Sequence, residues 1–285
     1  MVDVIKASGE KEKYVRNKLC DSLLKAGASK DVVDRVCGKI EKDLKEGTTT
    51  EELFKRAFTH LAEEDVHTAA RYNLKRGIQA LGPAGFLFEQ YVERILNAYG
   101  YETRRNVILA GVCVSHEVDI VAHKGKEHFL IEAKYHNKGG IKTDVTVAMY
   151  AYARLLDIAP IQEKKEAGGE TKHSMWLITN TKFTSTAITY GICKHMNMTG
   201  WSYPHEHSLE RLIFEKRLYP VTVLPSVSGG NFSSFAKEGL MLVLDIVSLT
   251  PESLAERIGF KKDHAEQIIK EALACSVKTE KKTTA

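Results

Sequence analysis

Two short apolar stretches decide how this chain folds: residues 118–121 read VDIV, and residues 130–135 read LIEAKY. Successive side chains of a β-strand point to opposite faces, so Glu132 and Lys134 share one face. A short turn between the two stretches would pair them as neighbouring strands and bring Asp119 alongside. Two carboxylates and a lysine at one sheet edge suit a divalent metal ion and an activated water. That is the chemistry of phosphodiester hydrolysis.

This pattern resembles the PD-(D/E)xK nuclease superfamily, and specifically its Mrr-like restriction endonuclease branch. The context is similar too, because a helix precedes the two strands and a further helix and strand follow them. The resemblance implies that Asp119 and Glu132 bind Mg²⁺ and that the backbone carbonyl of Ala133 completes the metal site. It also implies that Lys134 orients or deprotonates the attacking water. The plain alternative is a set of solvent-facing residues with an incidental ion pair, which contributes little.

A helix predicted over residues 85–99 precedes the strands and carries Glu89 on its apolar stripe. A carboxylate buried there without a partner is costly, so it should face a metal ion or a basic group. Nucleases of this superfamily often use such a helix glutamate as an extra metal ligand, which adds Glu89 to the expected ligands. The alternative is a partly exposed glutamate at the edge of the stripe.

The region around this motif alternates strands and helices. A helix over residues 144–156 is expected to turn its apolar stripe inward: Val145, Ala148, Met149, Tyr152 and Leu156. Strands are expected at residues 107–114, 117–123, 128–134, 175–180 and 221–224. The fold class is therefore α/β, with a restriction-endonuclease-like mixed sheet flanked by helices. We assign residues 82–231 to this nuclease-like domain.

The loop of residues 135–142 (YHNKGGIK) follows the motif directly and is basic and rich in glycine. Backbone groups and lysines of such a loop can contact phosphates, so His136, Lys138 and Lys142 are expected to bind DNA. His136 is interpreted as a structural residue or phosphate contact in preference to a catalytic one.

Residues 1–81 form a mainly helical N-terminal segment. Thr49 and Glu52 have the spacing of a capping box at the start of a helix. The segment resembles the ATP-cone, a nucleotide-binding regulatory module, at residues 4–6 (VIK) with Gly9, 17–19 (NKL), 48–53 (TTTEEL) and 69–76 (AARYNLKR). The resemblance implies that ATP or dATP binds, with Lys6 and Lys18 at the phosphates and Thr50 near the nucleotide. A helical dimerisation domain without nucleotide is the alternative.

Residues 232–285 are expected to form a small all-α domain. Thr250 and Pro251 provide an N-cap and a first-turn proline. The pattern resembles a helix-hairpin-helix domain, which implies that the turn at Gly259 brings backbone N–H groups to a DNA phosphate.

The bulk composition fits a globular protein, with 285 residues, 43% hydrophobic and 27% charged residues and a net charge of +4. No apolar run approaches the roughly 18 residues of a membrane span. The N-terminus lacks the layout of a signal peptide, so a cytoplasmic location without membrane association is expected. The five cysteines are scattered and odd in number, which argues against a disulfide framework and a zinc site.

These resemblances imply a magnesium-dependent endodeoxyribonuclease that is regulated by ATP or dATP and that acts in defence against foreign DNA. ATP hydrolysis is not implied, because the chain has no Gly-x-x-x-x-Gly-Lys-Ser/Thr loop. DNA and an adenine nucleotide are the expected partners, together with assembly into a homodimer or higher homo-oligomer. The alternative function is a nucleotide-responsive DNA-binding regulator whose nuclease core is inactive.

Overall fold

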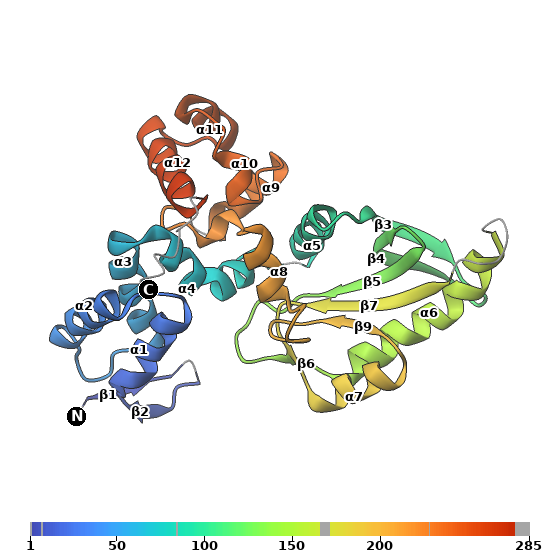
Figure 1. The fold of residues 1–285 in the computed structure, drawn as a ribbon, viewed down its shortest axis with the longest axis horizontal. Coiled ribbons are helices and arrows are strands. Elements are labelled where there is room, and N and C mark those ends of the chain that lie inside the picture. The colour runs from blue at the N-terminus through green and yellow to red at the C-terminus, as the bar shows by residue number, and fades with distance from the viewer. Residues whose placement is uncertain (1, 7, 84, 166–171, 228, 277–285) are drawn as a thin grey trace, which may run out of the picture. The chain divides into compact units, whose positions relative to one another are not determined.

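The chain forms two compact units, one made of residues 1–77 with 219–285 and the other of residues 78–218. The computed structural model describes residues 2–6, 8–83, 85–165, 172–227 and 229–276 (Figure 1). The sequence analysis divides the chain into three segments instead. The structure groups the first and last of these segments, and it gives the nuclease-like unit a C-terminal boundary earlier than residue 231.

The first unit begins with an antiparallel hairpin of β1 (Asp3–Ile5) and β2 (Lys11–Lys13), which turns at Gly9 with φ of 84°. Four helices follow: α1 (Arg16–Lys25), α2 (Lys30–Lys42), α3 (Thr50–Glu64) and α4 (Val66–Gln79). The predicted capping box at the start of α3 is confirmed. The Glu52 N–H donates to Thr49 Oγ1 at 3.1 Å, and the Thr49 N–H donates to Glu52 Oε2 at 2.9 Å.

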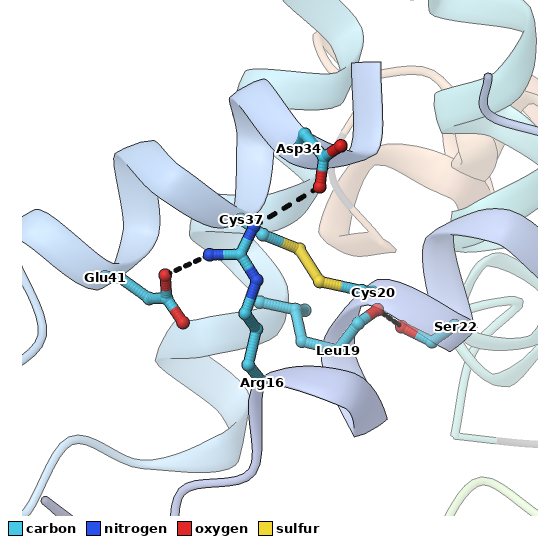
Figure 2. Close-up of a disulfide and its surroundings, with 7 residues drawn as sticks. All are labelled: Arg16, Leu19, Cys20, Ser22, Asp34, Cys37 and Glu41. Carbon is cyan, nitrogen blue, oxygen red and sulfur yellow. Dashed lines mark hydrogen bonds and ion pairs between the residues drawn. A yellow bond between two sulfur atoms is a disulfide. The ribbon is translucent and has the colours of Figure 1, made fainter. Parts of the chain in front are cut away.

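A disulfide joins Cys20 of α1 to Cys37 of α2, with their Cα atoms 6.4 Å apart (Figure 2). The sequence analysis argued against a disulfide framework and did not predict this pair. Arg16 spans the same two helices, because its guanidinium pairs with Glu41 and with Asp34, the latter at 3.4 Å. The two helices are thus held by a covalent bond and by ion pairs.

The C-terminal part of the same unit begins with a short 3₁₀ helix, η1 (Val221–Val223), where the sequence predicts a strand at residues 221–224. That prediction is wrong because this segment packs against α4 and not against a sheet. The Asn73 side-chain amide donates to the Thr222 and Val223 carbonyls at 3.4 and 3.3 Å, and the Thr222 hydroxyl donates to the Gly77 carbonyl at 2.7 Å. These bonds explain why two distant segments share one unit.

The remaining elements of this part are helical, as expected. They are η2 (Gly229–Asn231), α9 (Phe232–Lys237), α10 (Val243–Ile246), α11 (Pro251–Ile258) and α12 (Lys262–Ser276). Thr250 caps α11 by accepting the Ser253 N–H at 3.2 Å, and Pro251 opens the helix, as predicted. The buried Glu271 of α12 accepts hydrogen bonds from the Ser226 N–H and hydroxyl at 2.9 and 2.6 Å.

The second unit is built on a five-stranded mixed sheet in the order β3-β4-β5-β7-β9 (Figure 1). Its strands are β3 (Glu102–Ala110), β4 (Ser115–Lys124), β5 (Glu127–Lys134), β7 (His173–Thr179) and β9 (Asn197–Thr199). The first three strands are antiparallel to one another, while β5, β7 and β9 run parallel. A short parallel pair, β6 (Lys142–Thr143) and β8 (Lys182–Phe183), lies outside this sheet. The predicted mixed sheet flanked by helices is confirmed, although β3 ends before residues 111–114, which form a hairpin loop.

Helices of this unit are α5 (Phe86–Ala98), α6 (Val145–Lys165), α7 (Ser185–Cys193) and α8 (Leu209–Lys216). The helix α5 covers one face of the sheet, where its Glu93 pairs with Arg105 of β3 at 2.6 Å. The opposite face, which includes Leu130, packs on α6 and α7.

The predicted orientation of α6 is wrong in part. Met149 and Leu156 were expected to face the core, but their side chains are 51% and 58% exposed. The face that packs on the sheet instead carries Ala148, Ala151, Arg154 and Ile158, which are all buried.

Among the residues that the structure describes, none of the helices combines the length and the apolar character needed to span a bilayer.

Candidate active site

The structure brings Asp119 of β4 and Glu132 of β5 together. Ile120 lies opposite Ile131 in the antiparallel ladder, so Asp119 and Glu132 occupy the next pair of facing positions. Directly opposed residues of neighbouring strands share a face and lie close together. Lys134 follows two residues after Glu132 and therefore lies on the same face.

Each carboxylate is held through one of its two oxygens. The Ala133 N–H donates to Asp119 Oδ2 at 2.8 Å, which fixes the side chain across the two strands. The predicted contribution of Ala133 was its carbonyl; its N–H is the group that contacts the site in this structure. Glu132 Oε2 forms an ion pair with Arg154 Nη1 of α6.

The sequence analysis missed Arg154. Its side chain is 10% exposed and that of Glu132 is 15% exposed, so the pair is largely shielded from water. One signal was present: Arg154 is the only basic residue between Lys142 and Lys164 in a predominantly apolar stretch. A lone cation in such a helix requires a partner if it faces the core.

Burial, and for Glu132 also the neighbouring charge of Asp119, raises the pKa values of the two carboxylates. The pKa of Asp119 is raised chiefly by burial, while the Ala133 hydrogen bond and the Arg154 charge act against the increase. The pKa of Glu132 is also raised by burial and next by the Asp119 charge, again opposed by Arg154. Burial is therefore the main cause of both increases, and Arg154 partly offsets them.

Glu89 belongs to the same electrostatic group. Burial, and then the charge of Asp119, raises the pKa of Glu89 to about 7, while Arg105 lowers it. The side chain of Glu89 is partly exposed. Glu89 lies near enough to the carboxylate pair to be affected by its charge.

The backbone of β3 is irregular beside these groups. Arg105 lies opposite Ile120 and Val107 lies opposite Val118, so Asn106 lies opposite Asp119. Asn106 has φ of 52°, in the left-handed region that asparagine tolerates better than most residues. Such backbone conformations occur preferentially at functional sites.

The carboxylates of Asp119 and Glu132 fit a magnesium ion that takes few of its ligands from the protein. Across the described residues, no group of three or more His, Cys, Asp or Glu side chains is arranged to hold a metal ion. Asp119 and Glu132 are nevertheless adjacent, and each is anchored through one oxygen. Magnesium is usually bound by one or two carboxylates and completes its octahedron with water and substrate phosphate. The pair therefore suits a metal ion that enters with its waters, whereas Glu89 is not grouped with the pair as a third ligand among the described residues.

The three residues of the loop after β5 that are expected to bind DNA differ in their exposure to solvent. His136 is half-buried: its N–H donates to Asn180 Oδ1 at 2.9 Å, and its Nε2 lies 3.1 Å from the Thr143 hydroxyl. Burial, and then the Lys134 charge, lowers the pKa of His136, which favours a neutral ring. This environment agrees with the structural interpretation of His136. Lys138 and Lys142 are exposed and available to a phosphate backbone.

Two of the three residues expected at a nucleotide site line a common pocket in the first unit. The pocket has a volume of about 240 Å³, and Lys18 and Thr50 belong to its wall. Another wall consists of Phe54 and Tyr72, whose rings stack 4.7 Å apart, with the Arg76 guanidinium 3.5 Å from the centre of the Phe54 ring.

Lys6 is not part of this pocket wall. It pairs with Glu10 and Glu12, at 3.1 Å each, and the same Glu12 pairs with Lys18. These carboxylates raise the pKa of Lys6. A nucleotide phosphate at Lys18 would have to displace or share the Glu12 interaction.

Gly259 ends α11 in the left-handed conformation, with φ of 81°, and connects it to α12 as the sequence predicts for the turn. Its N–H donates to the Ala255 carbonyl at 2.9 Å, and so does the Phe260 N–H at 3.0 Å. These two groups are therefore already bonded within the turn.

Comparison with known proteins gives relatives without an assigned activity. An uncharacterized protein of Archaeoglobus fulgidus is 39% identical over 179 residues, which is 63% of this chain and 96% of that protein. A crystal structure of a protein of unknown function is 38% identical with a TM-score of 0.54, covering 65% of this chain and 96% of that chain. No protein-family model matches the sequence.

Removal of Arg154 should destabilise the second unit strongly. Arg154→Met leaves the Glu132 carboxylate buried without its cation, and breaking a buried pair costs about 3–5 kcal/mol. Both tryptophans of the chain, Trp176 and Trp201, lie in residues 78–218, so their fluorescence during urea unfolding reports this unit. The double variant Arg154→Met/Glu132→Gln should recover much of the loss. Additive effects of the two substitutions would show that the pair is not energetically coupled.

Glu89→Gln should raise the melting temperature of the metal-free protein at pH 8. The folded-state pKa of Glu89 lies above its usual value, so ionisation penalises the folded state fully above about pH 7. The penalty disappears as the pH falls toward the ordinary pKa of glutamate. The stabilisation should therefore shrink between pH 8 and pH 5, when melting is followed by tryptophan fluorescence in EDTA. Exposed Glu127→Gln is the control, and an equal shift at both pH values would refute the assignment.

Proposed function

For this chain, which belongs to the same family as the uncharacterized Archaeoglobus fulgidus protein, we propose the function of a magnesium-dependent endodeoxyribonuclease. The observation that carries the proposal is the facing pair of Asp119 and Glu132 on adjacent strands, with Lys134 on the same face. This arrangement is the one that the PD-(D/E)xK resemblance requires. The family relationship supplies no activity of its own, so the proposal rests on the site.

Each residue of the site has a separate role in the proposed phosphodiester hydrolysis. A bound Mg²⁺ would polarise the phosphate and lower the pKa of a coordinated water. Asp119 and Glu132 would hold the cation, and Glu89 would add negative charge from α5. Lys134 orients the attacking water and stabilises the charge that develops on the phosphate. Arg154 holds Glu132 in position from α6.

We propose that the pocket of the first unit binds ATP or dATP as a regulatory ligand. Aromatic rings at Phe54 and Tyr72 suit the adenine base, and Lys18 and Arg76 provide positive charge for phosphates. Binding there would shift the equilibrium between active and inactive states of the protein, or its assembly into homo-oligomers.

The alternative function is a nucleotide-responsive DNA-binding regulator with an inactive nuclease core. Two observations favour it: Glu132 is already paired with Arg154, and no cluster of three potential metal-binding side chains occurs among the described residues. Under this alternative, the ion pair between Glu132 and Arg154 would only stabilise the fold. DNA binding without a metal ion and without cleavage would support this alternative.

Supercoiled plasmid should be nicked or linearised by the protein in Mg²⁺ but not in EDTA, leaving 5′-phosphate ends. Asp119→Asn and Glu132→Gln should each reduce the rate at least about 100-fold, since loss of an outer partner of a metal ligand already costs 10–100-fold. The matched control is Glu127→Gln, an exposed residue of β5, the strand that carries Glu132. Cleavage by Asp119→Asn at the wild-type rate would show that the site is assigned wrongly.

Nucleotide binding can be measured separately by titration calorimetry with ATP and dATP. Lys18→Ala should weaken the affinity by about tenfold, equivalent to about 1.4 kcal/mol, because it removes one of the two lysines of the pocket wall. Lys25→Ala is the matched control, since Lys25 is exposed on the same helix. Equal affinities for both variants and the wild type would locate the nucleotide elsewhere. Cleavage assays with and without each nucleotide then give the sign of the regulation.

A further inference from the structure

The disulfide between Cys20 and Cys37 joins two helices that are anchored to the first unit very differently. In α2, four side chains are buried: Val33, Val36, Cys37 and Ile40. In α1, all of whose residues the structure describes, Leu23 alone is buried. Because the burial of apolar side chains is the dominant stabilising term in folding, α2 is held firmly by the core. The helix α1 depends more on its other contacts.

Two kinds of contact connect α1 directly to α2: the disulfide and the ion pairs of Arg16 with Asp34 and Glu41 (Figure 2). The Arg16 side chain is 41% exposed, and ion pairs at such exposed positions contribute little to stability. A disulfide restricts the chain far more strongly. Opening the disulfide should therefore loosen α1, while Arg16 still keeps it near α2.

The helix α1 also provides part of the wall of the pocket in the first unit. Lys18 and Leu19, which directly precede Cys20, line this pocket. Other wall residues, Phe54 and Tyr72, belong to α3 and α4, and neither of these helices contains a cysteine. A change at the disulfide therefore acts directly on the α1 part of the wall and not on the part that α3 and α4 supply.

The two sulfur atoms of the disulfide differ in their access to solvent. The side chain of Cys37 is buried, whereas that of Cys20 is partly exposed. A thiolate can attack only a sulfur atom that it reaches, so Cys20 is the point of attack for a reductant. Cys37 then remains in the core, where a protonated thiol behaves as a small apolar side chain.

We propose that Cys20 and Cys37 form a redox switch on the pocket of the first unit. The disulfide holds α1 in the arrangement that binds adenine nucleotide, and the dithiol form binds the nucleotide more weakly. This inference rests on the proposed nucleotide binding by the first unit. Its physical basis is preorganisation: a wall that is already fixed does not have to be ordered when the ligand binds.

The switch is opened by a dithiol reductant. One thiolate of the reductant bonds to the Cys20 sulfur, the bond between Cys20 and Cys37 breaks, and Cys37 leaves as a thiolate that takes up a proton. The second thiolate of the reductant then attacks the reductant sulfur of this mixed disulfide, and Cys20 leaves and is protonated. The protein gains two electrons and two protons, and the reductant becomes a cyclic disulfide.

The test uses the full chain with Cys113→Ser and Cys193→Ser, because these two exposed cysteines lie outside the first unit and would react with thiol reagents. Of the five cysteines, Cys20, Cys37 and Cys275 then remain. The denatured protein should contain one free thiol after treatment with oxidised dithiothreitol and three after treatment with dithiothreitol.

Titration calorimetry should show that the oxidised form binds ATP about tenfold more tightly than the reduced form. Hydrogen exchange should become faster on reduction in residues 16–25, and much less so in residues 30–42, because α2 is held by its buried side chains.

A variant then separates the switch from a general effect of the reductant. Cys20→Ser in the same background should bind ATP with the affinity of the reduced form under both conditions. The matched control is Leu24→Ser, which changes an exposed residue of the same helix and should retain the redox response. Circular dichroism verifies that both variants keep their helices. The two redox forms of the parent protein decide the question even if Cys20→Ser does not fold.

Three results would overturn the switch. Equal ATP affinities of the oxidised and reduced forms, with or without faster exchange in α1, would show that the disulfide only stabilises the fold, and the nucleotide site would stand. Three free thiols after the oxidising treatment would show that Cys20 and Cys37 do not pair. If neither form bound ATP or dATP, the proposed nucleotide site would fail, and the switch would fail with it.

Discussion

The ion pair between Glu132 and Arg154 is the constraint on which the arrangement of the second unit depends. A carboxylate that is 15% exposed is costly to bury unless a cation lies beside it, and α6 supplies that cation. The requirement fixes the rotation of α6 about its own axis. Ala148 and Ala151 then lie against the sheet, Met149 and Leu156 face solvent, and Asp157 reaches the β3–β4 hairpin.

This dependence explains which parts of the fold could be read from the sequence. The strands that carry Asp119 and Glu132 were predictable because alternation along a strand is a local property and the turn between them is short. The capping box of Thr49 and Glu52, and the turn at Gly259, were predictable for the same reason. Each is specified by residues within one or two turns of the chain.

The missed features all depend on contacts between distant segments. In the apolar helix around Arg154 several different stripes fit the helical period, and only the buried Glu132 on another strand selects the correct one. Cys20 and Cys37 pair because two helices pack side by side, which their spacing does not reveal. Residues 221–223 have a strand-like composition, yet α4 offers them hydrogen-bonding side chains in place of a neighbouring strand. The same rule applies to the candidate site. The sequence predicted its carboxylates, Asp119 and Glu132, but it did not predict Arg154, which pairs with Glu132.

The first unit is made from both ends of the chain, with residues 78–218 inserted between its two parts. The unit whose synthesis begins first is therefore the last to have all of its residues available for folding. The sheet-containing unit can fold as soon as its own residues emerge from the ribosome, whereas residues 1–77 must wait for residues 219–285 before Asn73 and Gly77 find their partners. In the folded protein the backbone passes between the two units twice, at residues 77–78 and at residues 218–219.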